Sequence, residues 1–507
     1  MKFVSADADP LRVQMKARQV KSSPDLSSAV PSLPTQVIVS RASRLPFLLP
    51  GEVLHCTLED SEGNLLNLTS FKLFCEDLAL NLPVSTIRRI VSSSWYFTIE
   101  TIEMRIVKVS SDDTSMRSSF LSILGSLAFS TAEMPFAFSY RPSIPFNHVY
   151  SPRDEFNRLD LSRFDLELSE VNVDFTLCPT LPQYLCLPRD FPEIPKVAEF
   201  RDKRRVPVCS FPRLWRSAQP LTSLGNRSQA DERMLEIIGG GNLLILDLRP
   251  QLNAIANQLV SGAGSEIPGN YPGAEVRFCD LQNIHVVRDC FERVWTSIRN
   301  MDGLHVSHSG WWSALDNSKW YDTVSRLLKT AMTVTQEVKV GRSVLVHCSD
   351  GWDRTPQITS LAMILMDSYY RTRQGFAVLI EKEWIAMGHK FHQRMSIGSK
   401  DDSDMSPVFV QWLDCVHQII DQNPSSFSFK DDFLLEIFNA AISAKYGNFL
   451  FNCEKERNER DVYKRTVSVW SDLLRDDEAV TLPSSAIEVK YGAPFIRPWN
   501  SFWLRFQ

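Results

Sequence analysis

One short stretch, "VHCSDGWDRTPQ" (residues 346–357), holds a cysteine and an arginine at a spacing that suits phosphoryl transfer. Arg354 follows Cys348 by six positions, and none of the other nine cysteines has an arginine at that distance. A thiolate is a strong nucleophile, and the planar guanidinium of arginine can hold two oxygens of a phosphoryl group in line with it. The pair therefore predicts hydrolysis of a phosphate monoester through a phosphocysteine intermediate.

The elements on both sides of this stretch must position it. The apolar run 343–346 predicts a strand, and the residues after Thr355 have helical periodicity, with Thr355 as N-cap and Pro356 in the first turn. Backbone N–H groups of the loop between them, which includes Ser349 and Gly351, would form an anion cradle with the helix N-terminus. A buried structural cysteine before an exposed loop is the alternative, and the strand and the hydroxyl of Thr355 favour the cradle.

Three further loop residues carry polar or aromatic groups. Asp350 and Asp353 could each protonate the leaving oxygen or be paired to hold the loop, and residue chemistry alone does not rank them. Trp352 could rigidify the loop as a plug or offer a face to a sugar ring, and both roles are compatible.

Charged residues outside the loop are the next candidates. Lys390 and Arg394 are four apart in a predicted helix and share one face, as a solvated basic surface or as a second phosphate contact. Asp247, in "LILDLRP", ends a predicted strand that points toward the same pocket. A structural pair with Arg249 is at least as well supported for Asp247 as a catalytic role.

Residues 163–507 alternate between strand-like and helical segments. Apolar runs at 242–250, 274–282 and 343–351 end in polar loops, and helical patterns lie between the second and the third. This order predicts an α/β domain with a central, mostly parallel sheet flanked by helices, and with its site at the carboxyl ends of the strands. The later part is expected to be helical, with Ser406 as one cap, Gly447 as a helix end, and a solvated loop at 452–465.

The N-terminal third has a different pattern. Residues 1–34 are rich in Ser and Pro and predict a disordered arm, and residues 142–162 predict a linker. Residues 35–141 are β-rich, with a hairpin at 61–64, and end in an amphipathic helix. A small β-barrel closed by one helix, like a pleckstrin-homology domain, and another small α+β module are both consistent with this pattern.

Composition excludes several classes of protein. A formal net charge of −5 gives no general attraction to nucleic acid, so an anionic ligand needs a local basic site. The 10 cysteines include no Cys-x-x-Cys pair, which argues against zinc or disulfides and for a reducing cytosolic compartment. Neither a signal peptide nor a run of about eighteen apolar residues is present, so no membrane span is expected.

The string "HCSDGWDRT" (347–355) resembles the signature of the myotubularin family of phosphoinositide 3-phosphatases. Similar segments are "NIHVVRD" (283–289), "SLAMILMDSYYRT" (360–372), "GFAVLIEKEWIAMGHKF" (375–391), "SPVFVQWLDCV" (406–416) and "KRTVSVW" (464–470). The resemblance covers about 165–470 firmly and the N-terminal module more faintly, where the family has a PH-GRAM domain. It implies a PH-GRAM-like domain followed by a cysteine phosphatase domain.

The resemblance also assigns roles to residues. It implies that Cys348 is the nucleophile, that Arg354 binds phosphate, that Asp353 is the general acid and that Asp350 bonds the inositol ring. The substrate-binding positions that it implies are Ser349, Asp350, Gly351, Trp352, Asn283, Ile284, Asn257, Lys390 and Arg394. Lys390 stands where arginine is common in the family, and because lysine lacks the bidentate fork, selectivity for a 5-phosphate is left open.

The function implied is removal of the 3-phosphate from phosphatidylinositol 3-phosphate and from the 3,5-bisphosphate, with no metal and no cofactor. A protein phosphotyrosine phosphatase and a catalytically inactive scaffold are the alternatives. The family further implies a cytoplasmic protein in peripheral contact with endosomal or other phosphoinositide-bearing membranes, and it leaves homo- or hetero-oligomers with other myotubularins open. Basic residues of "STIRRI" (85–90) and Lys108 are candidates for the membrane contact.

Overall fold

The computed structural model describes residues 47–129, 135–144, 146–222, 225–251, 264–299, 308–397, 403–475, 480 and 482–506. From Leu48 onward they belong to one compact unit, Leu48–Gln507. The disordered arm predicted at 1–34 lies outside the described residues. Within them, every helix is too short or too polar to span a membrane.

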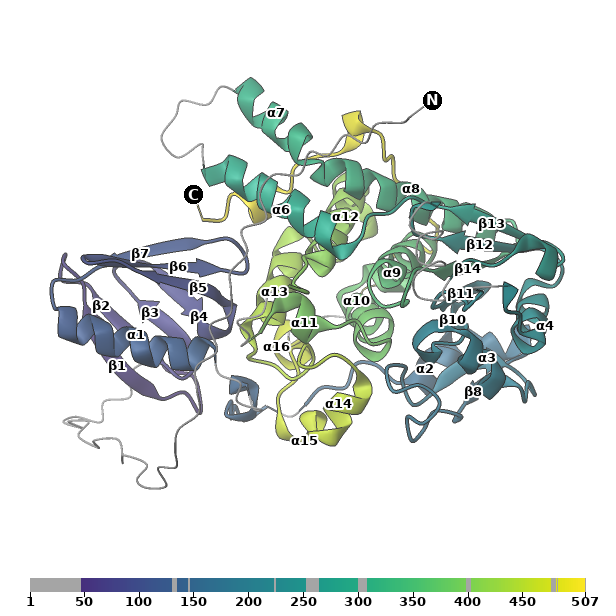
Figure 1. The fold of residues 1–507 in the computed structure, drawn as a ribbon, viewed down its shortest axis with the longest axis horizontal. Coiled ribbons are helices and arrows are strands. Elements are labelled where there is room, and N and C mark those ends of the chain that lie inside the picture. The colour runs from purple at the N-terminus through teal and green to yellow at the C-terminus, as the bar shows by residue number, and fades with distance from the viewer. Residues whose placement is uncertain are drawn as a thin grey trace, which may run out of the picture. The chain divides into compact units, whose positions relative to one another are not determined.

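Two antiparallel sheets and one helix make up the N-terminal part (Figure 1). One sheet contains β1 (Leu54–Glu59), β2 (Leu65–Thr69), β3 (Lys72–Cys75) and β4 (Leu80–Pro83), and the other β5 (Ile87–Ser92), β6 (Tyr96–Thr101) and β7 (Ile106–Ser110). Buried side chains of both sheets share a core with Phe120 and Leu124 of α1 (Thr114–Ala128). The predicted hairpin at 61–64 is confirmed, because β1 pairs with β2 across it.

The predicted linker contains regular structure. Pro152–Arg158 forms α2, whose N-cap Ser151 accepts a hydrogen bond from the Asp154 amide at 3.3 Å. The antiparallel pair β8 (Leu166–Ser169) and β9 (Leu185–Pro188) follows, and then α3 (Ile194–Phe200). The domain boundaries at 141 and 162 stay predictions.

A five-stranded sheet is the frame of the second part, as predicted, and only its edge pair is antiparallel. The spatial order is β10 (Val208–Phe211), β11 (Leu214–Ser217), β14 (Ser343–His347), β12 (Leu243–Asp247) and β13 (Ala274–Phe278). The central strand β14 runs parallel to both of its neighbours, and all its residues are buried. Parallel strands end at the same edge, so β11, β12 and β14 bring their following loops together.

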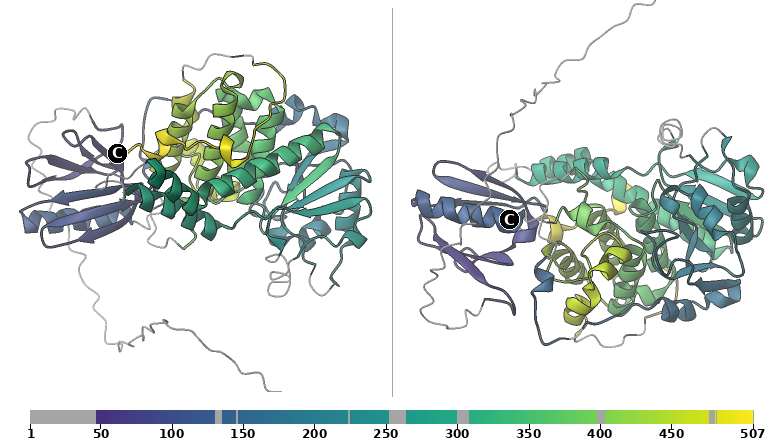
Figure 2. Two further views of the ribbon diagram at one scale, coloured as in Figure 1. Left: turned by 90° about the horizontal axis from the view of Figure 1, so that it is seen from above. Right: turned by 60° about the horizontal axis from the view of Figure 1, so that its bottom comes forward.

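Helices cover both faces of this sheet because alternate strand residues point to opposite sides. Val344 and Val346 of β14 pack with α8 (Trp320–Lys339) and α9 (Arg354–Met366), whereas Leu345 packs with α4 (Gln229–Gly239). Figure 2 shows the teal strands of the sheet beside the green helices from two further sides. The remaining helices before β14 are α6 (Ile284–Arg299) and α7 (His308–Ser318).

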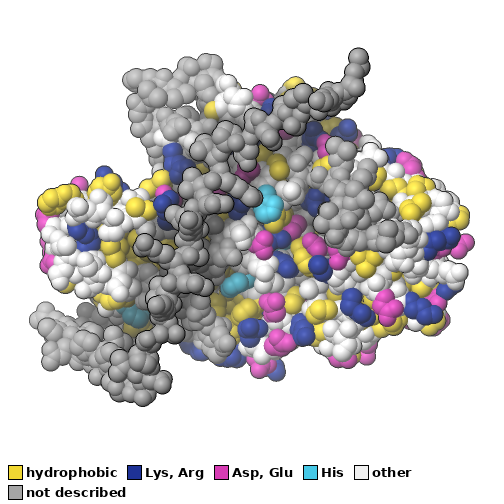
Figure 3. Space-filling view, in the orientation of Figure 1, with side chains coloured by type: hydrophobic (Ala, Val, Ile, Leu, Met, Phe, Trp, Pro, Cys, Tyr) yellow, Lys and Arg dark blue, Asp and Glu magenta, His cyan; other side chains and the backbone are white. Residues whose placement is uncertain are grey.

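The part after α9 is helical, as predicted. It contains α10 (Arg373–Ile380), the π-helix η8 (Glu381–Ala386), α11 (Phe391–Met395), α12 (Val408–Gln422), α13 (Asp431–Ser443), α14 (Glu454–Glu459), α15 (Val462–Arg465), α16 (Trp470–Leu473) and α17 (Asn500–Trp503). On the face shown in Figure 3, acidic and basic side chains are interspersed, which fits the modest net charge.

Three local predictions in this helical part are wrong. Ser406 does not cap α12, because its hydroxyl donates to the Ile284 carbonyl at 2.7 Å. Gly447 does not end α13, which stops at Ser443 with Ala444 in the left-handed region (φ 53°). A Cβ at Gly447 would lie 1.9 Å from the Thr466 hydroxyl, so close packing accounts for the glycine. Residues 452–465 form α14 and α15 rather than a solvated loop.

Candidate active site

Cys348 lies directly after β14, and its sulfur accepts two hydrogen bonds. The Gly351 amide and the Thr355 hydroxyl each donate to Cys348 Sγ at 3.3 Å. The prediction that Thr355 is the N-cap of α9 is therefore wrong. The helix starts at Arg354, and the Thr355 hydroxyl donates to the sulfur instead. The two donors thus hold the buried sulfur in place at the start of the loop.

Gly351 fastens the loop to the strand beside it. Its φ is +77°, and a Cβ there would lie 2.5 Å from the Ser217 carbonyl oxygen at the end of β11. Its own carbonyl accepts hydrogen bonds from Arg216 Nη2 at 2.8 Å and from Arg205 Nη2 at 3.4 Å. Only glycine combines this backbone conformation with this close approach.

Arg354 is held by the loop and by the end of the β13–α6 connection. Its Nη1 donates to the Leu281 carbonyl at 3.3 Å and its Nη2 to Ser349 Oγ at 3.4 Å. It opens onto a cavity of about 390 Å³. The residues that line this cavity are Arg249, Asn283, Ile284, His285, Cys348, Ser349, Asp350, Trp352, Asp353, Arg354 and Arg394.

Asp353 is buried, paired with Arg394 and in contact with His389. Arg394 Nε and Nη2 donate to its two oxygens at 3.0 and 2.8 Å, and His389 Nδ1 lies 3.2 Å from Asp353 Oδ1. Burial by itself raises the pKa of a carboxyl group, but Arg394 and His389 overcome it and hold the pKa of Asp353 well below its usual value. In the free site Asp353 is therefore a carboxylate.

Asp350 has the opposite electrostatic environment. Burial raises the pKa of its carboxyl group, and the nearby carboxylates Asp202 and Asp353 raise it further, while Lys203 and Lys390 partly oppose them. The two carboxylates of one loop thus have their pKa values pushed apart, which is how enzymes often separate an acid from a charge stabiliser.

Trp352 is a plug on the cavity side of the loop. Its side chain is buried, its carbonyl lies 2.8 Å from His389 Nδ1, and the ammonium of Lys390 sits 4.2 Å from the ring centroid. Lys390 precedes α11, and Arg394 lies within this helix with its side chain buried. Both charges are thus directed at residues of the loop, but only Arg394 lies in the helix in which both were predicted.

The structure brings most of the predicted site residues together. Asn283 and Ile284 line the cavity at the start of α6, where Asn283 Oδ1 accepts hydrogen bonds from the His285 and Val286 amides at 3.1 and 3.0 Å. Gly351 and Lys390 support the loop rather than line the cavity. Asn257 lies outside the described residues.

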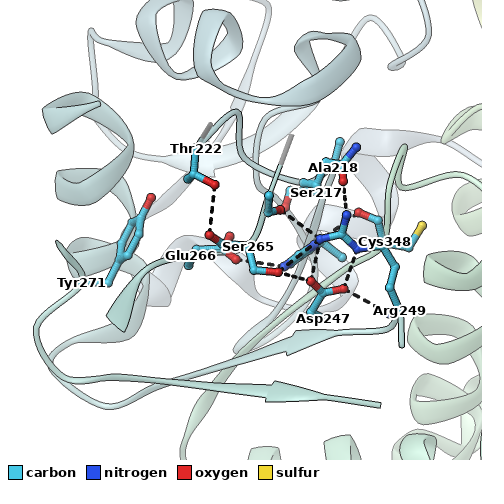
Figure 4. Close-up of polar contacts among 12 residues, drawn as sticks. Ser217, Ala218, Thr222, Asp247, Arg249, Ser265, Glu266, Tyr271 and Cys348 are labelled. Carbon is cyan, nitrogen blue, oxygen red and sulfur yellow. Dashed lines mark hydrogen bonds and ion pairs between the residues drawn. The ribbon is translucent and has the colours of Figure 1, made fainter. Parts of the chain in front are cut away.

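Two further residues line the cavity: His285, which the sequence analysis missed, and Arg249, which it named only as a partner of Asp247. Arg249 follows the end of β12 by two positions, so its place at the carboxyl edge of the sheet was the available signal. It forms a buried ion pair with Asp247 at 2.6 Å and also donates to Gln219 and the Gly264 carbonyl (Figure 4). The structural interpretation of Asp247 is confirmed by this pair.

A fully buried ionic network lies behind the loop, and sequence reasoning missed it as well. Glu266 accepts from Arg201 Nη1 at 2.6 Å and lies 3.0 Å from His347 Nε2, while Arg201 also pairs with Asp231 at 2.7 Å. The other ring nitrogen of His347 is 3.2 Å from the Cys348 carbonyl oxygen. Burial lowers the pKa of His347, but Glu266 and Asp247 more than compensate and raise it. Figure 4 shows Glu266, Asp247 and Arg249 converging next to Cys348.

No cluster of three or more His, Cys, Asp or Glu side chains in the described residues could hold a metal ion. The cavity lining combines hydrogen-bond donors and three guanidinium groups with the two loop carboxylates, one of which is paired with Arg394. The chemistry of the donors and the guanidinium groups suits a phosphoryl group.

Known proteins match this chain over most of its length. The family model for the Myotubularin-like phosphatase domain matches residues 135–458. Myotubularin of Xenopus tropicalis is 35% identical over 509 residues, which cover 90% of this chain and 84% of that protein. The protein of Mus musculus named phosphatidylinositol-3,5-bisphosphate 3-phosphatase MTMR2 is 32% identical over 552 residues, covering 97% of this chain and 85% of that protein. The resemblance seen in the sequence is thereby confirmed, and the chain belongs to the myotubularin family.

Proposed function

We propose that this chain is a phosphoinositide 3-phosphatase that acts on phosphatidylinositol 3-phosphate and on the 3,5-bisphosphate. The observation that carries the proposal is the sulfur of Cys348, held by two hydrogen-bond donors and facing a cavity of about 390 Å³ with Arg354 and Arg394 in its wall. A relative that aligns with 97% of the chain is named as a 3-phosphatase of phosphatidylinositol 3,5-bisphosphate, which supports the second of these substrates.

The proposed reaction has two steps, formation and hydrolysis of a phosphocysteine. The Cys348 thiolate attacks phosphorus and forms an S–P bond as the P–O bond to the inositol oxygen breaks, and a loop carboxyl group gives that oxygen its proton. Arg354 and the loop amides hold the negative charge on the other phosphoryl oxygens. In the second step the carboxylate takes a proton from a water molecule. The water oxygen bonds to phosphorus as the S–P bond breaks, which releases phosphate and the free thiolate.

The acid is proposed to be Asp353, under a condition set by its surroundings. Arg394 and His389 keep Asp353 ionised in the free site, so substrate phosphate must draw Arg394 away before Asp353 can hold a proton. Asp350, whose pKa is raised by burial, is the competing acid. Asp353→Asn should lower single-turnover cleavage more than Asp350→Asn does, and the reverse order would assign the acid to Asp350.

The other binding residues predicted from the sequence are proposed to hold the headgroup. Arg394 and Lys390 would meet a second phosphate, with Lys390 contributing one ammonium charge instead of a bidentate fork. Ser349, Trp352, Asn283, Ile284 and Asn257 are proposed to contact the inositol ring. We also propose a cytoplasmic location, peripheral contact with endosomal or other phosphoinositide-bearing membranes, and association with other myotubularins.

The decisive experiment measures phosphate release from short-chain phosphatidylinositol 3-phosphate, from the 3,5-bisphosphate and from a phosphotyrosine peptide. The intact chain should release phosphate from the lipids, and Cys348→Ser should not. Cys290→Ser, at a buried cysteine of α6, is the matched control and should keep the activity.

Other outcomes of this assay would contradict the proposal. Turnover of the peptide equal to or faster than that of the lipids would assign the chain to protein phosphotyrosine phosphatases. No release from any substrate by a folded chain would support the inactive scaffold instead.

A further inference from the structure

A second cavity, of about 190 Å³, lies between the segment 146–152, η8, α14 and α15. It shares no lining residue with the active-site cavity, so the proposed phosphatase mechanism makes no use of it. Five aromatic rings line it, from Phe146, His148, Tyr150, Tyr184 and Tyr463. The acidic lining residues are Glu381, the first residue of η8, and Glu454, the first residue of α14.

Each of the two carboxylates has an oxygen without a donor in the described part of the chain. Asn448 Nδ2 and Trp470 Nε1 both donate to Glu381 Oε1, at 2.6 Å each, and Glu381 is only 8% exposed. The Gln183 amide donates to Glu454 Oε1 at 3.4 Å. Both residues line the cavity, so a ligand in it can reach their carboxylate groups.

Positive charge near these carboxylates is directed elsewhere. Arg457, which is fully buried, donates to the carbonyl oxygens of Ile385 and Phe451, at 3.2 Å each, rather than to either carboxylate. Burial raises the pKa of Glu454 to about 7 and also raises that of Glu381. The cavity therefore has acidic oxygens whose charge the surrounding protein does not fully compensate.

Three of the aromatic rings that line the cavity pack against one another. The rings of Phe146 and Tyr463 are 5.4 Å apart and nearly perpendicular, at 89°, and the His148 ring lies 4.5 Å from Phe146. Elsewhere in this chain such faces carry a cation, as where Lys445 sits 4.9 Å from the Tyr140 ring centroid. Among the described residues, no lysine or arginine lies over any of the five cavity rings.

Aromatic faces combined with carboxylates select one class of ligand. An anion would be repelled by Glu381 and Glu454, and the described residues offer no set of three ligating side chains for a metal ion. A weakly hydrated organic cation gains from both features, because ring faces attract it and a carboxylate neutralises it. The volume of about 190 Å³ accommodates a trimethylammonium group.

We propose that this cavity binds a small alkylated ammonium ion, with Glu381 and Glu454 neutralising its charge and the rings of Phe146 and Tyr463 contacting its methyl groups. The cation is either free or the headgroup of a choline lipid, and the chemistry of recognition is the same for both.

The first test compares choline with 3,3-dimethyl-1-butanol, which has the same shape and no charge, by calorimetric titration of the full chain. Choline should bind at least about tenfold more tightly than the alcohol, because only the cation gains from the rings and the carboxylates. Equal affinities, or no saturable binding of choline, would overturn the proposal.

Paired variants then locate the site. Glu454→Gln should weaken choline binding about tenfold, in line with loss of a charge partner. Glu459→Gln changes the same charge in the same helix at an exposed position, and it should leave binding unchanged. Tyr463→Phe keeps the ring and should bind choline, whereas Tyr463→Leu should not. Unchanged binding in folded Glu454→Gln and Tyr463→Leu proteins would overturn the assignment.

Vesicle binding distinguishes the two sources of the cation. If the headgroup is the ligand, the chain should sediment with phosphatidylcholine vesicles, and added free choline should lower the fraction of the chain that sediments. If free choline binds in the titration but does not displace the chain from vesicles, the ligand is the free cation. Both results support the cation site, and both are compared with Glu454→Gln as the loss-of-site control.

Discussion

The two sides of the phosphate loop both hold carboxylates next to arginines, but they differ in access to the cavity. On the cavity side, Asp350 and Asp353 line the space where substrate would bind. On the buried side, Asp247 and Glu266 have fully buried side chains, each paired with an arginine. The buried charges can only hold the loop in one geometry, whereas those of the cavity side can exchange a partner or a proton when a phosphate arrives.

This comparison predicts that stability depends most on the buried side. Glu266→Gln should lower the free energy of unfolding by about 3–5 kcal/mol, because it removes one of the two buried carboxylate partners of Arg201 and the carboxylate that contacts His347. Asp322→Asn removes an exposed ion pair with Lys319 and should cost about 0–1 kcal/mol. Urea denaturation followed by circular dichroism measures both. Equal losses in the two variants would mean that burial does not separate the two kinds of pair.

The contact between the loop and β11 should be the next most sensitive feature. Gly351→Ala places a Cβ 2.5 Å from the Ser217 carbonyl oxygen and should lower kcat by about a hundredfold, because a misplaced loop loses the in-line geometry. Gly63→Ala has a similar positive φ with open space around it, so it controls for backbone strain alone. Its kcat should stay at the wild-type value, and a comparable loss there would refute the steric explanation.

The pH dependence of stability sharpens the same distinction. The pKa values of Glu266 and Asp353 are lowered in the folded chain, so their contribution is complete above the unfolded carboxyl range, about pH 4, and is lost as the pH falls. The pKa of Asp350 is raised, so its contribution is lost as the pH rises. The destabilisation caused by Glu266→Gln should therefore be smaller at the lowest pH where both proteins fold than at pH 7. Urea titrations at the two pH values measure it, and a constant difference would contradict the assignment.

The smallest expected effect concerns Lys390 on the cavity side. Lys390→Arg adds a bidentate fork near the Trp352 ring and should raise the preference for the 3,5-bisphosphate over the monophosphate by a few-fold. The ratio of kcat/KM for the two lipids measures this effect. Lys196→Arg, on the exposed surface of α3, is the control and should leave the ratio unchanged. An unchanged ratio in Lys390→Arg would place this residue in a loop-supporting role only.

Local sequence was sufficient to predict the loop, because its strand, its glycine and its arginine lie within twelve positions of one another. The parallel sheet was predictable for the same reason, since apolar runs and helical periods alternate along the chain. The role of Thr355 was predicted wrongly, because a hydroxyl at that position can either cap a helix or reach back to the cysteine.

The buried side could not be predicted because its partners are far apart in the sequence. Arg201, Glu266 and His347 belong to three separate segments, and no periodic pattern connects a buried ionic residue to its partner. The same applies to the second cavity, where Glu381 and Glu454 approach one another only in the folded chain. Residues of this kind can be recognised only in the folded structure, because neither composition nor spacing identifies them.

The π-helix η8 has a consequence for how this chain tolerates insertions and deletions. Its first residue, Glu381, faces the second cavity, while Glu383, two positions later, accepts a hydrogen bond from Arg216 at 2.8 Å and so reaches the phosphate loop. A π-helical turn contains one residue more than an α-helical turn. Deleting one residue within Glu381–Ala386, other than the two glutamates, would return the segment to α-helical hydrogen bonding and keep the register of the residues on both sides. His389 and Arg394 could then keep their contacts with Asp353, so this segment should absorb a one-residue deletion that the phosphate loop could not.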